Sequence, residues 1–383
     1  MPLRTTFLLW MFGFALSHPM AQDLVTLASL PDLVAESSGI EISGPNKIWT
    51  FNDSGGEPEL YLVDTLGNLL RTLFVAGANN RDWEDITQDD GGNFFIGNIG
   101  NNTNANTDLT IFRIPNPDAV AADTIRAEAI AFAYEDQVAF PPPEDSLNFD
   151  CEALMWYEDR LYLASKNRTM PFDGKTHLYR LPDTPGTYVA EKIGTFDTGG
   201  STMLNFWITA GDISPDGSKL ALLSSDKIWV FYDFSGDNFF SGQNERIGLG
   251  NFSQKEAIAW VTENDLYITD EQTLPGFGGN LYAIRIEDVI VGVPHGPEPL
   301  QSLRAYPNPA RDQLLLDFQL IRRDEVRLEL LDASGKRIRT LLTGTYSAGQ
   351  HVERIDLSML PPGTYLLQGS VGKERIATSI VRP

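Results

Sequence analysis

A repeated unit of short strands constrains the fold of residues 24–290 more than any other feature of the sequence. Each unit opens with an acidic residue beside a small or apolar one, enters a short hydrophobic strand, turns, and continues with two further strands. Almost no helical periodicity interrupts this pattern. The shortest spacings between openings match one four-stranded blade of ~40–50 residues. The openings are Gly39–Ile42, Trp83–Ile86, Cys151–Leu154, Ala210–Ile213 and Lys255–Ile258.

The repeat predicts an all-β fold, with a β-propeller whose four-stranded sheets surround a central axis. The last unit ends after its third strand, near Ile286, and a strand at Leu24–Leu30 can supply the missing outer strand. Pairing the two chain ends in this way leaves no exposed sheet edge. We favour five blades. Six blades stay open as an alternative if residues 188–207 form another set of strands.

The chain changes character after the repeats. A Pro/Gly-rich linker at residues 292–300 separates the predicted propeller, residues 22–291, from a tail at residues 301–383 whose alternating strands predict a small β-sandwich. The tail has 12 lysines and arginines against 9 acidic residues, or +3, whereas the whole chain is −23, so the remainder is −26. This difference indicates two domains with different roles, and the net charge argues against nucleic acid as a partner.

The N-terminus has the pattern of an export signal. Arg4 precedes an apolar run at Phe7–Leu16, which is shorter than the roughly 20 residues that span a bilayer. We therefore predict a cleaved signal peptide at residues 1–21, with a retained anchor as the alternative, and no transmembrane segment in the mature chain.

Cys151 is the only cysteine, so we expect no intramolecular disulfide and a buried, inert thiol.

Three motifs in the tail resemble a known family. They are Tyr306–Pro309, Leu330–Lys336 and Leu360–Tyr365, and the stretch of roughly residues 301–383 resembles the type A C-terminal sorting domain of the type IX secretion system of Bacteroidetes. The resemblance implies passage across both membranes, the type IX machinery as a partner, and release or attachment at the cell surface after removal of the tail. The ending Ile380–Pro383 departs from the lysine-bearing strand frequent in that family. A generic β-sandwich binding module is the alternative.

The repeats resemble a broader group. The segments Asn79–Ile86 and Ile96–Asn102, with the repeated Glu-Ala at Glu152 and Glu256, are similar to secreted bacterial propellers of the esterase-like, phytase-like and calcium-centred groups. This similarity concerns the fold more than a reaction.

The unit openings supply candidate metal ligands, because the innermost strand of each blade lines the central channel. Carboxylates that converge there must either take up protons or be neutralised by a cation. Oxygen ligands of this kind suit Ca²⁺. We therefore expect a calcium ion held by a subset of the following residues, with the last as a neutral ligand: Glu41, Glu84, Glu152, Asp212, Glu256 and Asn98. The alternative is that these side chains bind backbone amides of neighbouring blades.

Catalytic signatures are mostly absent. Neither Gly-x-Ser-x-Gly nor His-Glu-x-x-His occurs, and the repeats contain a single histidine, His177. The reaction that stays open is calcium-assisted hydrolysis of an ester or phosphoester. Glu84 and Asp85 are then the candidate carboxylates for acid–base chemistry, and Lys166 and Arg81 the cations for an anionic substrate. The alternative is a non-catalytic surface propeller that binds a protein or glycan.

Overall fold

The computed structural model is almost entirely β-structure and describes residues 20–21, 24–199, 202–272, 278–286, 300–320, 323–331, 337–371 and 374–383. Its single α-helix in this part of the chain is α1, Met203–Phe206. The chain divides into two compact units, Met1–Val291 and Gly292–Pro383. Most of the predicted signal peptide and almost all of the predicted linker lie outside the described residues.

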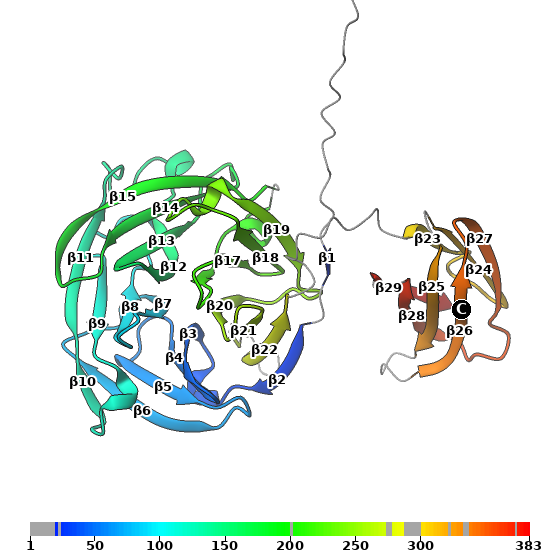
Figure 1. Ribbon diagram of the computed structural model, residues 1–383, viewed down its shortest axis with the longest axis horizontal. Coiled ribbons are helices and arrows are strands. Elements are labelled where there is room, and N and C mark those ends of the chain that lie inside the picture. The colour runs from blue at the N-terminus through cyan, green and yellow to red at the C-terminus, as the bar shows by residue number, and fades with distance from the viewer. Residues whose placement is uncertain are drawn as a thin grey trace, which may run out of the picture. The chain divides into compact units, whose positions relative to one another are not determined.

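The first unit consists of antiparallel sets of strands that run outward around a common axis (Figure 1). Every set begins with one of the predicted unit openings at its inner edge. These inner strands contact one another in sequence, and the last contacts the first. They are β3 (Ser37–Gly44), β7 (Trp83–Gln88), β12 (Asp150–Tyr157), β16 (Ala210–Ile213) and β20 (Lys255–Trp260).

The remaining strands of each set follow in chain order, each hydrogen-bonded to the one before it. The second strands are β4 (Lys47–Asn52), β8 (Phe94–Asn98), β13 (Arg160–Lys166), β17 (Lys219–Ser224) and β21 (Asp265–Asp270). The third strands are β5 (Glu59–Val63), β9 (Thr110–Ile114), β14 (Lys175–Pro182), β18 (Lys227–Tyr232) and β22 (Asn280–Arg285).

The outer edge shows how the ring closes. The outer strands are β6 (Leu69–Ala76), β11 (Glu128–Tyr134), β15 (Gly186–Asp197), β19 (Gln243–Gly248) and β2 (Val25–Ser29). As predicted, the strand β2 near the start of the chain pairs with β22, the last strand of this unit. The outer strands β11 and β15 pair in parallel and so join two sets into one sheet. Two short strands, β10 (Thr124–Arg126) and β1 (Met20–Ala21), add to the edges at β6 and β19.

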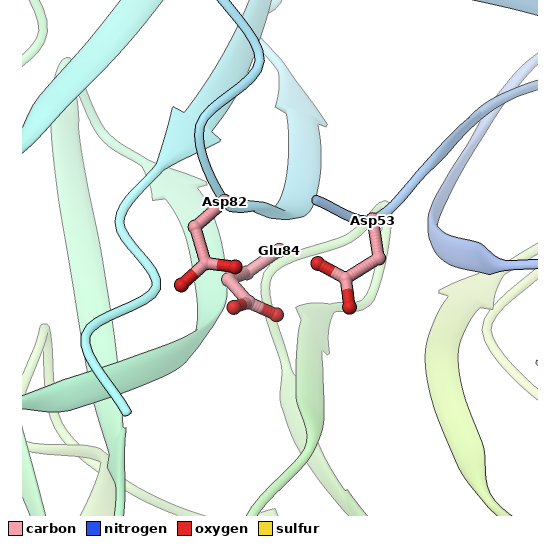
Figure 2. Close-up of side chains that lie close together, drawn as sticks. All are labelled: Asp53, Asp82 and Glu84. Atoms are coloured by element: carbon pink, nitrogen blue, oxygen red, sulfur yellow. The ribbon is translucent and has the colours of Figure 1, made fainter. Parts of the chain in front are cut away.

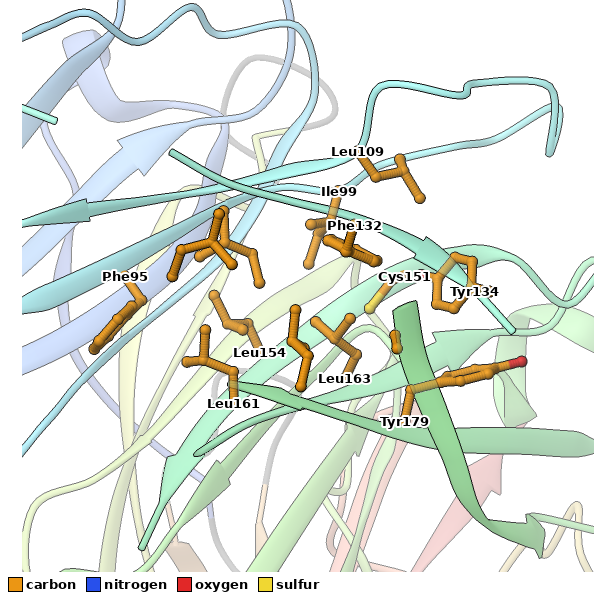
Figure 3. Packing of buried hydrophobic residues seen from close by; sticks show 14 of the residues in the cluster. Phe95, Ile99, Leu109, Phe132, Tyr134, Cys151, Leu154, Leu161, Leu163 and Tyr179 are labelled. Carbon is orange, nitrogen blue, oxygen red and sulfur yellow. The ribbon is translucent and has the colours of Figure 1, made fainter. Parts of the chain in front are cut away.

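Apolar side chains fill the space between neighbouring sets. One cluster joins the sets that begin with β7 and β12 and includes Phe95, Ile130, Leu163 and Tyr179, all fully buried (Figure 3). Cys151 lies in this cluster, and burial raises the pKa of its thiol well above the usual range. The prediction that Cys151 is buried is therefore confirmed, and a raised thiol pKa disfavours the reactive thiolate.

The second unit contains two sheets that share one core. The first is β23 (Leu300–Tyr306), β24 (Gln313–Leu320) and β27 (Gly349–Asp356); the second is β26 (Arg337–Tyr346), β25 (Asp324–Leu331), β28 (Gly363–Val371) and β29 (Glu374–Arg382). Alternate residues of β24, such as Leu316 and Phe318, are buried with Leu328 of β25 and Leu367 of β28. This period of two is what a sheet with one buried face requires.

The first tail motif contacts the end of the last strand. The side-chain oxygen of Asn308 accepts a hydrogen bond from the backbone N–H of Val381 at 2.9 Å, and the N–H of Ala310 donates to the carbonyl of Val381 at 2.8 Å. The guanidinium of Arg382 donates to the carbonyl of Arg311 at 2.9 Å. The segment around Asn308 and the end of β29, which lie at opposite ends of the tail sequence, are therefore joined by hydrogen bonds.

We predict that Asn308→Ala destabilises the second unit by about 1 kcal/mol, because it removes one hydrogen bond to the backbone of β29. For a domain of this size the calorimetric transition of the tail should move down by roughly 4–8 °C. Differential scanning calorimetry of the full chain measures this shift.

All seven tryptophans precede residue 292, so tryptophan fluorescence follows the first unit alone and should not change. Met359→Ala is the matched control, because Met359 is 89% exposed. An unchanged tail transition in Asn308→Ala would contradict the role given to Asn308.

Candidate functional site

A bulge near the start of the inner strands sets the direction of three glutamates. The pairing register shifts by one residue in β3, β7, β12 and β20, and the extra residues are Ser38, Glu84, Glu152 and Glu256. A β-bulge leaves one residue outside the ladder and re-aims its side chain. The three glutamates are at most 5% exposed, so β7, β12 and β20 each place one buried acidic group at the bulge.

Three carboxylates converge near the start of β7 (Figure 2). Asp53 follows β4, Asp82 precedes β7 and Glu84 lies on β7, and one oxygen of each is within 4.8 Å of the others. We call this group the Asp53 triad. Among the described residues, none of the three carboxylates has a hydrogen bond or an ion pair, and Glu84 is only 5% exposed. Asp53 and Asp82 are half-buried, so the triad is open to solvent on their side.

The backbone beside the Asp53 triad leaves room for the carboxylates. A Cβ at Gly100 would lie 2.1 Å from Oε1 of Glu84 and 2.3 Å from Oδ2 of Asp82, so no larger residue fits there. The side-chain oxygen of Asn98 accepts hydrogen bonds from the backbone N–H groups of Arg81 and Asp82, both at 3.1 Å. Asn98, a predicted metal ligand, therefore orients the segment that carries Asp82.

Burial and mutual repulsion act on all three carboxylates. Burial, with repulsion from Asp82 and Glu152, raises the pKa of Asp53 to about 7. Burial, with repulsion from Asp150, raises the pKa of Asp82. Burial, followed by repulsion from Glu152, raises the pKa of Glu84 well above its usual range. Burial and mutual repulsion therefore both disfavour the ionised form of these carboxylates, and a bound cation would offset this cost.

A second group of carboxylates shares Glu84. Oxygens of Glu84, Asp150 and Glu152 also lie within 4.8 Å of one another, and we call this group the Asp150 triad. Here the protein supplies its own cations. Arg168 donates from Nε to Asp150 and lies 3.4 Å from Glu152 through Nη2, while Nζ of Lys166 is 2.5 Å from Glu152.

Lys166 is enclosed. Its Nζ is also 3.7 Å from Glu256 and 4.5 Å from the ring centre of Trp207. Burial lowers the pKa of Lys166, but attraction to Glu152 and Glu256 outweighs it and raises the pKa overall. Lys166, predicted as a substrate-binding cation, is therefore a charged counter-ion inside the site.

Three predicted site residues have a different environment. Asp85 accepts a hydrogen bond from the N–H of Leu154 on β12 at 2.9 Å, and Asp212 from the N–H of Trp260 on β20 at 2.7 Å. Glu41 accepts from the side chain of Gln88 on β7 at 2.7 Å. Each links its inner strand to another, as in the alternative that the sequence left open, and none belongs to either triad.

Arg81 and His177 also lie outside the triads. Arg81 pairs with Asp108 and donates to the carbonyls of Asn98 and Gly100, both at 3.3 Å. His177 lies on β14, where burial lowers its pKa to about 4.

The sequence reasoning missed Asp82, Asp150 and Arg168 as site residues. A signal for the first two exists: Asp-x-Glu occurs at Asp82–Glu84 and again at Asp150–Glu152, each time where an inner strand begins. Arg168 stands two residues beyond Lys166 and follows β13. Nothing in its sequence context distinguishes it from a surface arginine.

Comparison with known proteins identifies the tail. Residues 304–382 match the family of secretion system C-terminal sorting domains. The protein is accordingly exported to the cell surface or released from the cell by type IX secretion. In the part of the chain that the structure describes, no helix is long and apolar enough to cross a membrane.

Solved structures with low sequence identity are also similar to this chain. The PQQ-bound aldose sugar dehydrogenase of Streptomyces coelicolor is similar over 70% of this chain and 99% of its own, with 10% identity and a TM-score of 0.45. PorZ, a surface component of the type IX secretion system of Porphyromonas gingivalis, is similar over 90% of this chain and 51% of its own, with 11% identity and a TM-score of 0.29. A comparison with curated proteins gives no significant match.

We predict that Asp85→Ala lowers the free energy of unfolding of the first unit by about 2 kcal/mol, because the buried N–H of Leu154 loses its acceptor. Urea unfolding followed by tryptophan fluorescence measures this change.

Glu128→Ala is the control, because Glu128 is an exposed residue of β11 and should change stability by no more than about 0.5 kcal/mol. If Asp85→Ala were as stable as this control, Asp85 would not be fastening β7 to β12.

Proposed function

We propose that this exported protein is a five-bladed β-propeller, followed by a β-sandwich sorting domain, that binds one calcium ion at the mouth of its central channel. The closed sequence of contacts among β3, β7, β12, β16 and β20 supports five blades. The core shared by the two sheets of the tail supports the sandwich. The signal peptide at residues 1–21 remains a prediction from the sequence.

The Asp53 triad is the proposed calcium site. The observation that carries it is the carboxylate of Glu84, which is more than nine-tenths buried, has no hydrogen bond or ion pair with another described residue, and points at two further carboxylates. A buried charge without a partner is costly, and a cation removes this cost. Carboxylate oxygens suit Ca²⁺ better than metals that prefer nitrogen or sulfur.

The other sequence-predicted ligands are less suitable for the ion. Glu152 and Glu256 have Lys166 as a counter-ion, and Asp212 accepts a backbone N–H. Oε1 of Glu41 and the side-chain oxygen of Asn98 likewise accept hydrogen bonds from protein donors. Among the described residues, the Asp53 triad is the group that combines convergence, burial and the lack of a protein partner.

The bound ion would serve to hold an anionic group of a surface protein or glycan. The half-exposed Asp53 and Asp82 leave one side of the triad accessible to such a ligand. Binding without hydrolysis is favoured because Lys166 and Arg81, the cations predicted to hold a substrate, are already paired with protein carboxylates. No histidine or cysteine belongs to either triad.

Hydrolysis of an ester or phosphoester is the second candidate. A calcium ion supplies Lewis-acid polarisation of a carbonyl or phosphoryl oxygen. The observation that favours this candidate is the pKa of about 7 at Asp53, which places a carboxyl suited to proton transfer at the open side of the triad.

We predict that the wild-type chain binds one Ca²⁺ and that Asp53→Asn weakens this binding at least about tenfold, because it removes a charged ligand at the open side of the triad. Isothermal titration calorimetry with calcium chloride measures affinity and stoichiometry. Calcium should also raise the melting temperature of the first unit, since a ligand of the native state stabilises it.

Asp64→Asn is the matched control, because Asp64 makes its hydrogen bonds within an exposed turn. No binding heat and no rise in melting temperature at millimolar calcium would refute the calcium site.

We predict that a panel of carboxylate and phosphate esters gives no turnover above background, with or without calcium, because Lys166 and Arg81, the side chains predicted to hold a substrate, are paired with protein carboxylates. Product release measured on the full chain checks this expectation. Turnover that both a chelator and Asp53→Asn abolish would instead establish the hydrolase.

A further inference from the structure

The two neighbouring triads of carboxylates differ in whether the protein supplies them with a cation. The Asp53 and Asp150 triads each satisfy the same spacing and share Glu84. The Asp53 triad lacks an ion pair within the described residues, whereas Asp150 and Glu152 of the Asp150 triad form ion pairs with Arg168. A channel mouth with two such triads could hold two divalent ions if no side chain occupied either position.

The guanidinium of Arg168 is fixed at the Asp150 triad from several sides. It donates to Asp150 through Nε and lies near Glu152 through Nη2, and the charge of Glu84 also acts on it. The ring of Trp207 lies 5.3 Å from its central carbon. Burial lowers the pKa of Arg168, but attraction to Asp150 and Glu152 outweighs burial, so the guanidinium stays charged.

The carboxylates are also held in place for this interaction. Oδ1 of Asp150 accepts the backbone N–H of Asn101 at 2.7 Å, which leaves Oδ2 for Arg168. Lys166 holds the other oxygen of Glu152 at 2.5 Å. The whole arrangement is more than half-buried, and the side chain of Arg168 is 21% exposed.

We propose that Arg168 occupies, as a permanent internal cation, the position at which the Asp150 triad would otherwise bind a second divalent ion. The channel mouth is then a one-ion site because of a single side chain. This inference rests on the proposed calcium site for the ion count of the wild-type chain. The change in the number of bound calcium ions between the wild type and Arg168→Gln tests the role of Arg168 separately.

The test compares calcium stoichiometry in the full chain by titration calorimetry and equilibrium dialysis with calcium chloride. The wild type should bind one ion. Arg168→Gln should bind two, because Asp150 loses its ion-pair partner and Glu152 keeps only Lys166, while the three carboxylates remain. Arg168→Lys, which keeps the charge, should bind one. Arg168→Gln combined with Asp53→Asn should bind one ion, now at the Asp150 triad.

An unchanged stoichiometry in folded Arg168→Gln would overturn the inference. Asp150→Asn in the otherwise native chain tests the same point without removing the arginine. Its calcium affinity should stay within about threefold of wild type, because Asp150 serves Arg168 and not the ion. A loss of tenfold or more would place the native ion at the Asp150 triad and overturn the inference.

The inference and the proposed function fail in different ways. If the wild type bound no calcium but Arg168→Gln bound one ion, the proposed function would fail and the role of Arg168 would stand. If the wild type bound one ion and Arg168→Gln also bound one, the calcium site would stand and the role of Arg168 would fail. Binding by neither protein would refute both.

Discussion

The bulge shared by four inner strands is the constraint on which the chemistry of the channel mouth depends. Without it, Glu84, Glu152 and Glu256 would continue the strand ladder and alternate between the two faces of their sheets. The bulge instead turns all three glutamates toward the axis, where burial makes uncompensated charge expensive. The surrounding residues reduce this cost where they supply hydrogen-bond donors or counter-ions.

The protein compensates buried charge in two ways. The carboxylates of Asp85 and Asp212 accept hydrogen bonds from backbone N–H groups of the neighbouring inner strand, which links the inner strands to one another. Glu152 is neutralised by Lys166 and Arg168. Glu84 belongs to both triads, and no described residue forms a hydrogen bond or an ion pair with its carboxylate. That difference, more than the number of acidic residues, singles out the Asp53 triad for a cation.

The sequence predicts the sets of strands well because each opening recurs with the same order of elements. It aligns the openings less well, because a bulge cannot be seen in a strand pattern. A Cβ at Gly211 would lie 3.2 Å from that of Ala153, the residue that follows the bulged Glu152, so Asp212 falls two residues beyond the bulge position. Outside the bulge, Asp212 accepts the backbone N–H of Trp260 and belongs to neither triad.

The tail gives the calcium proposal its physical setting. Export places the channel mouth outside the cell, where calcium sites of extracellular modules work with dissociation constants of about 10⁻⁴–10⁻³ M. A site of three carboxylates, two of them half-exposed, needs no higher affinity than this to be occupied there. The charge of Arg168, which acts on Glu84, would lower the affinity of the proposed site, since it would compete with the ion for the same carboxylate. One arginine can thus set both the number of ions and the strength with which the remaining ion is held.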